Sequence, residues 1–262
     1  MSTVAKVDLR DLGAIGLDQS HEFGDRTAMA ERVYFAKGQD ADLEKAFASA
    51  RSTFRYFWRE LSWEQHRIVK AWNVVAVKVA FTDGNLVEHM WVNDLGYDGR
   101  TITGSLLNEP LELTNVEQGD EVEIEFGERV EDWMLASERG VLGGFTINLM
   151  RTRMAPDERA GHDEAWGLLF PDRVELPPDG DDHPMALNMA DSFGQFLREN
   201  PDEATGVDEQ GSTMLHREAL AGNANIVAML LAHGAKRDAK TRDGRTALEL
   251  AKGWPKVESL LR

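Results

Sequence analysis

The chain has 262 residues, enough for one large domain or two ordinary ones, and its 42% hydrophobic and 29% charged residues are typical of a soluble globular protein. The net charge of −17 disfavours binding to nucleic acid or to an anionic membrane and favours a basic protein partner. The absence of cysteine excludes disulfides, thiol nucleophiles and thiolate zinc sites. No signal peptide or membrane-spanning stretch is recognisable, so we expect a cytoplasmic protein, although the absence of cysteine also suits a periplasm.

The negative charge is concentrated in one part of the chain. From Pro201 onward there are nine acidic and nine basic residues, so the whole imbalance lies in residues 1–200. The densest stretch runs from Leu106 to Glu138, with eleven acids and the single base Arg129. Such a stretch is either a binding surface for a cationic protein or a well-hydrated face that keeps the protein soluble.

Residues 1–30 show no clear periodicity, and we interpret them as a lead-in segment. From Asp40 the spacing of apolar residues becomes helical and predicts one long helix; its apolar positions are Leu43, Ala46, Phe47, Ala50, Phe54, Phe57 and Leu61. Beyond this helix, β-branched runs on both sides of Asp83-Gly84 predict a hairpin with that dipeptide as its turn.

Further strands are predicted at Thr101–Leu106, Glu121–Phe126 and Gly143–Arg151. Together these elements indicate that residues 31–155 form an α+β domain, in which an antiparallel sheet curls into a half-barrel beside the long helix. Residues 156–183 are rich in Pro, Gly and Asp and are expected to be a linker or covering loop without regular structure.

Residues 184–262 have an all-α pattern with an internal repeat. Gly211, Thr213 and Leu215 recur 33 residues later as Gly244, Thr246 and Leu248. The stretch "GSTMLHREALAGNANIVAMLLAHGA" resembles the ankyrin repeat, with Met and Glu at positions where that repeat has Pro and Ala. The resemblance implies a capping helix and two repeats, the last truncated, and a structural part for His216.

Two repeats cannot bury their own apolar faces, so we expect this short stack to pack against the preceding half of the chain. Ankyrin stacks present their turn tips to protein partners, which implies partner contacts at Asp208, Glu209 and Gln210 and at Lys240, Thr241 and Arg242. The second tip lies in a basic cluster (Lys236, Arg237, Lys240, Arg242 and Arg245). The cluster either binds an acidic partner or docks on the acidic N-terminal domain.

Three stretches of the N-terminal domain are "AVKVAFTDGNLVEHMWVNDL", "LLNEPLELTNVEQGDEVEIEFGERVEDWML" and "GGFTINLM", preceded by the helix "DLEKAFASARSTFRYFW". In this order they resemble the bacterial YegJ-like domain of unknown function over residues 31–154. The resemblance implies a fold but no activity.

The hairpin register offers one candidate site. A turn at Asp83-Gly84 pairs Lys78 with His89 and Ala76 with Trp91, which places Lys78, His89 and Trp91 on one face as a possible ligand patch. The alternative is that His89 packs under the long helix with its nitrogen satisfied. Catalytic, nucleotide-binding and metal-binding motifs are absent from the sequence, so no catalytic residue, metal or cofactor is predicted.

These observations favour a non-enzymatic protein-binding module, in its most specific form an immunity-type protein that neutralises a basic toxin. The alternatives are a small-molecule-binding or catalytic domain centred on the His89 and Trp91 face, and a purely structural stack that covers the sheet domain. The sequence does not identify the partner or the oligomeric state.

Overall fold

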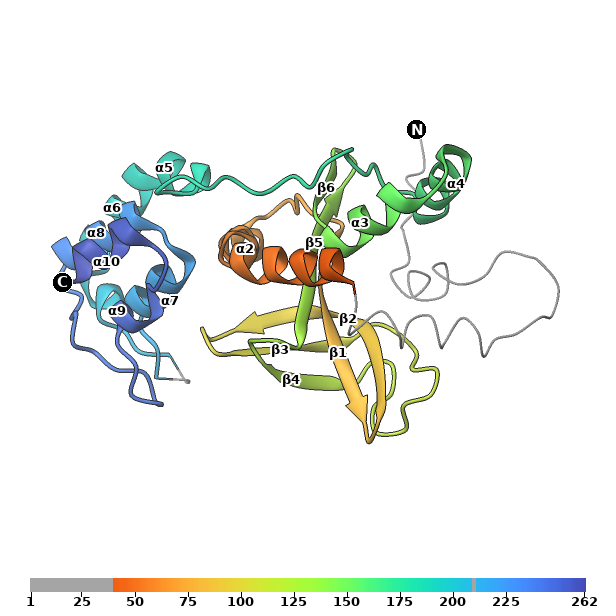
Figure 1. Cartoon of the computed structure of the whole chain (residues 1–262). Helices are drawn as coiled ribbons and strands as arrows, with labels where there is room; N and C mark the ends of the chain where they lie inside the picture. Colours follow the sequence, from red (N-terminus) through yellow and green to blue (C-terminus); the bar gives the residue numbers. More distant parts are fainter. Residues whose placement is uncertain (1–39, 209–210) are drawn as a thin grey trace. The chain divides into compact units, whose positions relative to one another are not determined.

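A computed structural model describes residues 40–208 and 211–262 of the chain (Figure 1). The expected lead-in, residues 1–30, therefore lies outside the described part. The described residues divide into two compact units: one takes residues 40–54 together with Val69–Leu176, and the other takes Arg55–Ile68 together with the described part of Pro177–Arg262. The long helix α2 (Ala41–His66) thus contributes its first part to one unit and its last part to the other.

The first unit is built on a six-stranded sheet in the order β4-β3-β2-β1-β5-β6, in which all neighbouring strands are antiparallel. Figure 1 shows how strongly the sheet twists between β4 and β6. The sheet and its helices confirm the predicted α+β class. The strands are β1 (Val74–Asp83), β2 (Leu86–Tyr97), β3 (Thr101–Leu106), β4 (Glu121–Glu125), β5 (Val130–Ser137) and β6 (Gly140–Gly143).

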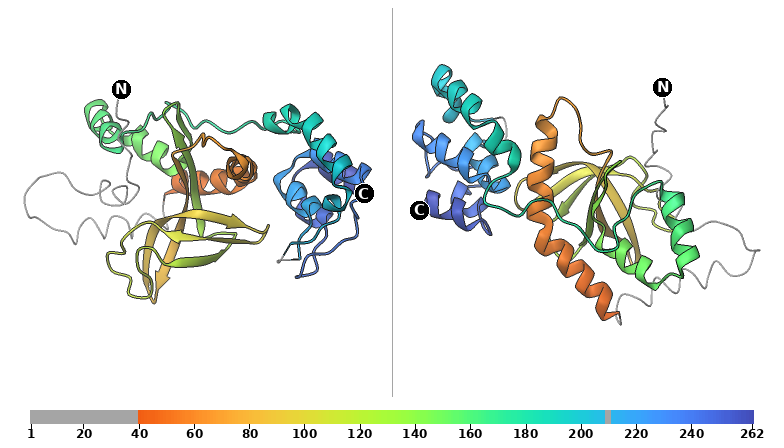
Figure 2. Two further views of the ribbon diagram at one scale, coloured as in Figure 1. Left: turned by 180° about the vertical axis from the view of Figure 1, so that it is seen from behind. Right: turned by 90° about the horizontal axis from the view of Figure 1, so that it is seen from above.

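Helices cover both faces of this sheet (Figure 2). On one face, the indole N–H of Trp133 in β5 donates to the carbonyl of Ala50 in α2 at 3.0 Å. On the other face, Trp91 and Met134 lie in a buried cluster with Ile147 of α3 (Phe145–Arg153) and Trp166 of α4 (Pro156–Trp166). The face that carries Trp91 is therefore the one that α2 does not cover. His89 lies two residues before Trp91 in β2 and so shares this face, which corrects the alternative that places His89 under the long helix.

The β1–β2 hairpin turns one position later than predicted. Asp83 pairs with Leu86, so the turn is Gly84-Asn85, and Gly84 adopts a φ of 59°, which glycine reaches without steric cost. As a result Lys78 pairs with Trp91, and His89 pairs with Ala80. The predicted pairing of β1 with β2 is therefore wrong by two residues. Because side chains along a strand alternate between the two faces, Lys78, His89 and Trp91 still lie on one face, as predicted.

Two segments differ from the sequence prediction. The predicted strand Gly143–Arg151 is wrong, because β6 ends at Gly143 and α3 begins at Phe145. The buried Asp132 carboxylate of β5 accepts the backbone N–H groups of Phe145 (2.9 Å) and Thr146 (2.7 Å), and so caps this helix from a distant strand. Residues 156–183 also contain a regular element, α4, which starts at Pro156.

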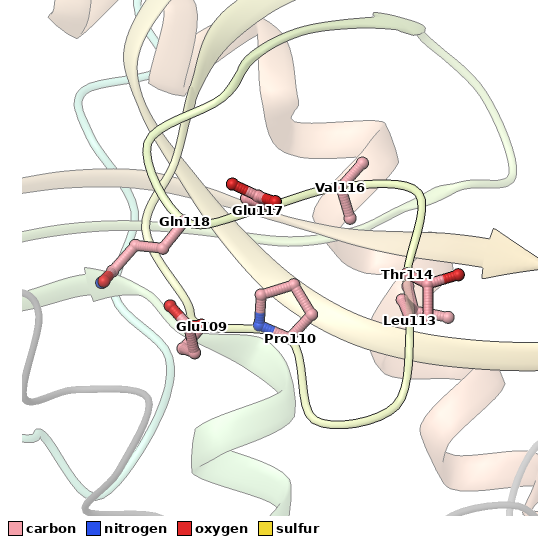
Figure 3. Close-up of a pocket in the computed structure, with 7 residues that line it drawn as sticks. All are labelled: Glu109, Pro110, Leu113, Thr114, Val116, Glu117 and Gln118. Carbon is pink, nitrogen blue, oxygen red and sulfur yellow. The ribbon is translucent and has the colours of Figure 1, made fainter.

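The loop between β3 and β4 is fixed by acidic side chains of the hairpin. The Glu88 carboxylate accepts backbone N–H groups of Leu111, Glu112 and Leu113 at 2.6–2.9 Å, and Asp83 accepts the hydroxyl and backbone N–H of Thr114. The loop encloses an open hollow of about 540 Å³ (Figure 3). It is lined by Glu109, Pro110, Leu113, Thr114, Val116, Glu117 and Gln118.

The second unit is helical, in agreement with the predicted all-α region. Helix α8 packs against α6 and α7, while α9 and α10 pack on α7 and α8. Its buried core includes Leu197, Leu215, Val227, Leu230 and Val257. The elements are α5 (Pro184–Asn188), α6 (Ala190–Glu199), the 3₁₀ helix η2 (Pro201–Ala204), α7 (Met214–Ala221), α8 (Ala224–Ala232), α9 (Ala247–Leu250) and α10 (Pro255–Leu261).

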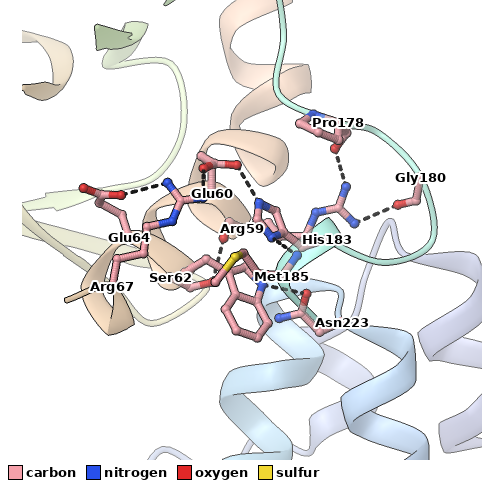
Figure 4. A network of polar contacts seen from close by, with 11 residues as sticks. Arg59, Glu60, Ser62, Glu64, Arg67, Pro178, Gly180, His183, Met185 and Asn223 are labelled. Atoms are coloured by element: carbon pink, nitrogen blue, oxygen red, sulfur yellow. Dashed lines mark hydrogen bonds and ion pairs between the residues drawn. The ribbon is translucent and has the colours of Figure 1, made fainter. Parts of the chain in front are cut away.

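The last part of α2 completes this core. Trp63 and Tyr56 join the apolar cluster of the stack, and the indole N–H of Trp63 donates to the Asn223 side-chain oxygen at 3.1 Å. The buried Arg59 donates to the carbonyls of Pro178 and Gly180 (Figure 4). The Arg59 guanidinium also lies 4.4 Å from the ring centre of Trp254. The short stack is therefore supported by residues that precede it in the chain.

We predict that Trp63→Ala destabilises the second unit by about 3 kcal/mol, because it removes a buried aromatic ring and leaves the Asn223 amide without its donor. Trp63→Phe keeps most of the ring and should cost about 1 kcal/mol, chiefly the lost hydrogen bond. Native-state hydrogen exchange of the α7 and α8 amides measures both effects. Equal protection in the wild type and Trp63→Ala would show that the stack does not depend on α2.

Candidate functional site

Two loops extend side by side from one end of the helical stack, one before α7 and one before α9 (Figure 1). Each is closed at its base by a single β-bridge, Val207 with Thr213 and Lys240 with Thr246. The two threonines then cap the following helices, since the Thr213 hydroxyl accepts the N–H of His216 and the Thr246 hydroxyl accepts the N–H of Glu249. The 33-residue repeat thus reproduces the same loop and the same cap.

His216 ties the two loops together. Its Nδ1 accepts the backbone N–H of Thr213 at 3.0 Å, so its Nε2 carries the proton and donates to the carbonyl of Ala239 in the second loop, also at 3.0 Å. The side chain is buried, and this burial lowers the pKa of the imidazole. These contacts give His216 a structural part, as its place in the repeat implies.

Of the residues predicted to contact a partner at the tips of the two loops, some hold the loop backbone in place and others are exposed. Asp208 accepts the backbone N–H of Ser212 at 2.7 Å and pairs with Arg217 at 2.6 Å. The buried Thr241 hydroxyl accepts the N–H of Arg245 and donates to Asp243, so both residues shape their loops. Lys240 and Arg242 are exposed. Glu209 and Gln210 lie outside the described residues.

The exposed charge of the second loop is basic. Besides Lys240 and Arg242, the neighbouring Lys236 and Arg237 are exposed, whereas Arg245 is half-buried and pairs with Asp243 at 2.5 Å. This loop therefore presents several cations from a backbone that buried side chains hold in shape.

The second predicted site lies on the face of the sheet that carries Trp91. Lys78 Nζ lies 5.8 Å from the ring centre of Trp91, and His89 Nδ1 lies 2.5 Å from Glu131 Oε2. The Glu131 side chain is 1% exposed and that of His89 is 17% exposed. The structure therefore brings together Lys78 and Trp91, and gives His89 a buried acidic partner.

Glu131 was not predicted as part of this patch. A register shift in the β1–β5 ladder pairs Val130 with Val79 and Asp132 with Lys78, which leaves Glu131 as the extra residue of a bulge. A bulge has no sequence signal of its own here. None of the residues that line the hollow in Figure 3 belongs to this patch.

Within residues 40–208 and 211–262, no group of three or more His, Asp or Glu side chains is arranged to hold a metal ion. Burial raises the pKa of the Asp132 carboxyl, against the lowering influence of its hydrogen bonds to Thr146 and Phe145. No helix in the described part of the chain combines the length and the apolar character needed to cross a bilayer.

Residues 40–170 match a family described as "Uncharacterized protein conserved in bacteria (DUF2314)". The chain belongs to the DUF2314 family. It is 43% identical over 244 residues to a Neisseria meningitidis serogroup B protein named "Putative ankyrin repeat protein", an alignment that covers 87% of this chain and 96% of the relative. It is also 38% identical over 73 residues to the Escherichia coli K12 "Uncharacterized protein YegJ", covering 28% of this chain and 47% of that protein.

These matches confirm the resemblance to YegJ and to ankyrin repeat proteins that the sequence indicated. The family match covers the sheet, the whole of α2 and the helices α3 and α4. The alignment with the Neisseria protein is long enough to include parts of both units of this DUF2314 chain.

The neutral state of His216 predicts an acid-sensitive second unit. Because burial lowers the folded-state pKa below the ordinary 6.5, the unfolded chain binds the proton more readily, and stability falls as the pH drops through 6.5. We expect the melting temperature of the helical unit to decline between about pH 7.5 and 5.5, and His216→Gln to make that decline shallower. Circular dichroism melts across this range measure it, and identical slopes for the two proteins would contradict the assignment.

Proposed function

We propose that this protein is a non-enzymatic protein-binding module that contacts its partner through the two loops of the helical stack. The observation that carries the proposal is the contrast within the second loop: Thr241 is buried and holds the backbone, while Lys240 and Arg242 are exposed. A loop whose backbone is held in shape by a buried side chain loses little conformational entropy on binding. The Neisseria relative, named as an ankyrin repeat protein, supports the same reading.

We further propose that the partner is a basic protein, and that the module is of the immunity type, which neutralises a toxin by covering it. What supports this is charge: eleven acids and one base lie between Leu106 and Glu138, and of the acids Glu131 and Asp132 are buried. The remaining acids give the sheet unit a negative potential that speeds encounter with a cationic protein. The second stack loop, whose exposed charge is basic, then contacts an acidic region of the same partner.

The loop contact is tested by Lys240→Ala combined with Arg242→Ala. Loss of two exposed cationic side chains at the centre of an interface should weaken binding of the native partner by about tenfold or more. The partner is first isolated on the wild-type chain at low salt and then titrated by calorimetry. Lys252→Ala with Arg262→Ala is the control, since it removes the same charge outside the loops. If both double variants bind alike, the loops do not form the interface.

A second candidate function is ligand binding or catalysis at the patch of Lys78, His89 and Trp91. It is favoured by the contact between His89 Nδ1 and the buried Glu131 carboxylate, because a carboxylate on one ring nitrogen orients the other for proton transfer or for a ligand. Lys78 adds a cationic neighbour on the same face, which suits an anionic small molecule.

This candidate predicts a metabolite that stabilises the chain through His89. A compound at about one hundred times its dissociation constant should stabilise the folded protein by about 2.7 kcal/mol. In a thermal-shift screen of small anionic compounds, His89→Asn should remove the shift, while Thr82→Ala, exposed in the same strand pair, should keep it. A screen in which no compound depends on His89 would reject the site.

A further inference from the structure

The outer edge of the sheet at β4 presents backbone groups that pair with no other strand of the described residues. Strand β4 is the last strand of the ladder, and no described strand pairs with its outer side. Phe126 N–H donates to the Arg100 carbonyl and Leu106 N–H donates to the Asp120 carbonyl, so the even-numbered residues here face β3. In an antiparallel strand the N–H and C=O of alternate residues point to opposite sides. Glu121, Glu123 and Glu125 therefore direct their backbone groups outward.

The side chains of these three residues line one exposed face of the same edge. Glu121, Glu123 and Glu125 are all exposed, and across the ladder they face Ser105, Thr103 and Thr101. The only cation paired with them in the described part of the chain is Arg100, 3.4 Å from Glu125, and both side chains of that pair are largely exposed. Exposed pairs of this kind contribute little.

The opposite face of this edge is apolar. Ile124 is buried, and Val122 between the glutamates is half-buried. Phe126 packs against Tyr97 and Phe54 with ring centres 5.7 and 4.8 Å apart. A strand added at this edge would place alternate side chains beside the carboxylates and the intervening ones beside Val122.

We infer that the β4 edge binds an extended basic segment of the partner protein as a seventh strand, with lysine or arginine alternating with apolar residues. This inference rests on the proposed function, and it names the partner's chemistry and its mode of binding. Charge complementarity selects this occupant, because a second copy of β4 would bring carboxylates directly opposite carboxylates. Backbone pairing supplies the affinity and the glutamates supply the selectivity.

The test uses the full chain and a short capped peptide of alternating lysine and valine, with an alternating glutamate and valine peptide as the control probe. The lysine peptide should bind and slow hydrogen exchange at the amides of Glu121, Glu123 and Glu125, and the glutamate peptide should not bind. Replacing the three glutamates by glutamine should weaken binding about tenfold at low salt, and the difference should shrink as salt rises.

Glu123→Pro separates backbone pairing from charge. Proline removes the outward N–H but no bond to β3, and proline is tolerated on edge strands. Compared with Glu123→Ala, which loses the same carboxylate and keeps the N–H, we expect about fivefold weaker binding. Circular dichroism and the exchange of β3 amides verify that both variants stay folded. Equal affinities, protection at other amides, or no binding by the wild type would overturn the inference.

This outcome is independent of the stack loops. If the peptide binds at β4 while Lys240→Ala with Arg242→Ala leaves the native partner's affinity unchanged, the loop-based function fails and the edge stands. If the loop variant loses the partner but the peptide shows no protection at β4, the edge inference fails alone.

Discussion

The second unit depends on one interaction, the packing of the Trp63 indole of α2 on the helical stack. Its N–H reaches the Asn223 side-chain oxygen, and the Asn223 amide donates in turn to Glu218 at 2.8 Å. Glu218 stands where ankyrin repeats have a small alanine, and here its carboxylate is held by the same Asn223 side chain that accepts the Trp63 indole N–H of α2. Burial raises the pKa of the Glu218 carboxyl, which is the cost of placing an acid at a helix contact. Trp63 and Tyr56 of α2 add apolar surface to this core, which two repeats alone cannot complete.

Around Trp63 the contact is polar as well as apolar, and every charged group in it has a partner. Arg67 pairs with Glu64 and with Glu60, each at 3.1 Å, and the other oxygen of Glu60 accepts the Nε2 proton of His183 at 2.7 Å. The His183 ring stacks on Trp63 at 5.6 Å and caps α5 by accepting the N–H of Met185. Buried ion pairs add little net stability, but a buried charge that loses its partner is costly. Such a network therefore favours the one arrangement of α2 on the stack in which each of these charges keeps its partner.

Much of this could be predicted from local patterns, and the failures share a cause. The long helix, the hairpin strands and the 33-residue repeat each carry their signal within a short window, and each is present. The helix at Phe145 was predicted as a strand because its cap, Asp132, lies in another strand. The pairing of His89 with Glu131 depends on a bulge in β5 and on a hairpin turn at Gly84-Asn85. Neither the position of the bulge nor that of the turn could be predicted from the local sequence pattern. That α2 is the support of the stack follows only from tertiary contacts, although the need for a support was evident from the number of repeats.

Charge divides the molecule in a way that bears on partner choice. The acids that make the chain strongly negative lie in residues 1–200, whereas the loop around Lys240 is basic on a segment of balanced charge. A protein that meets both surfaces must carry basic and acidic regions of its own, and like-charge contact excludes most others. The same carboxylates on β4 also protect an open sheet edge from pairing with copies of itself, since inserting a charged edge beside an identical one is unfavourable. The carboxylates that would attract a basic segment are therefore the same ones that disfavour self-pairing of the edge.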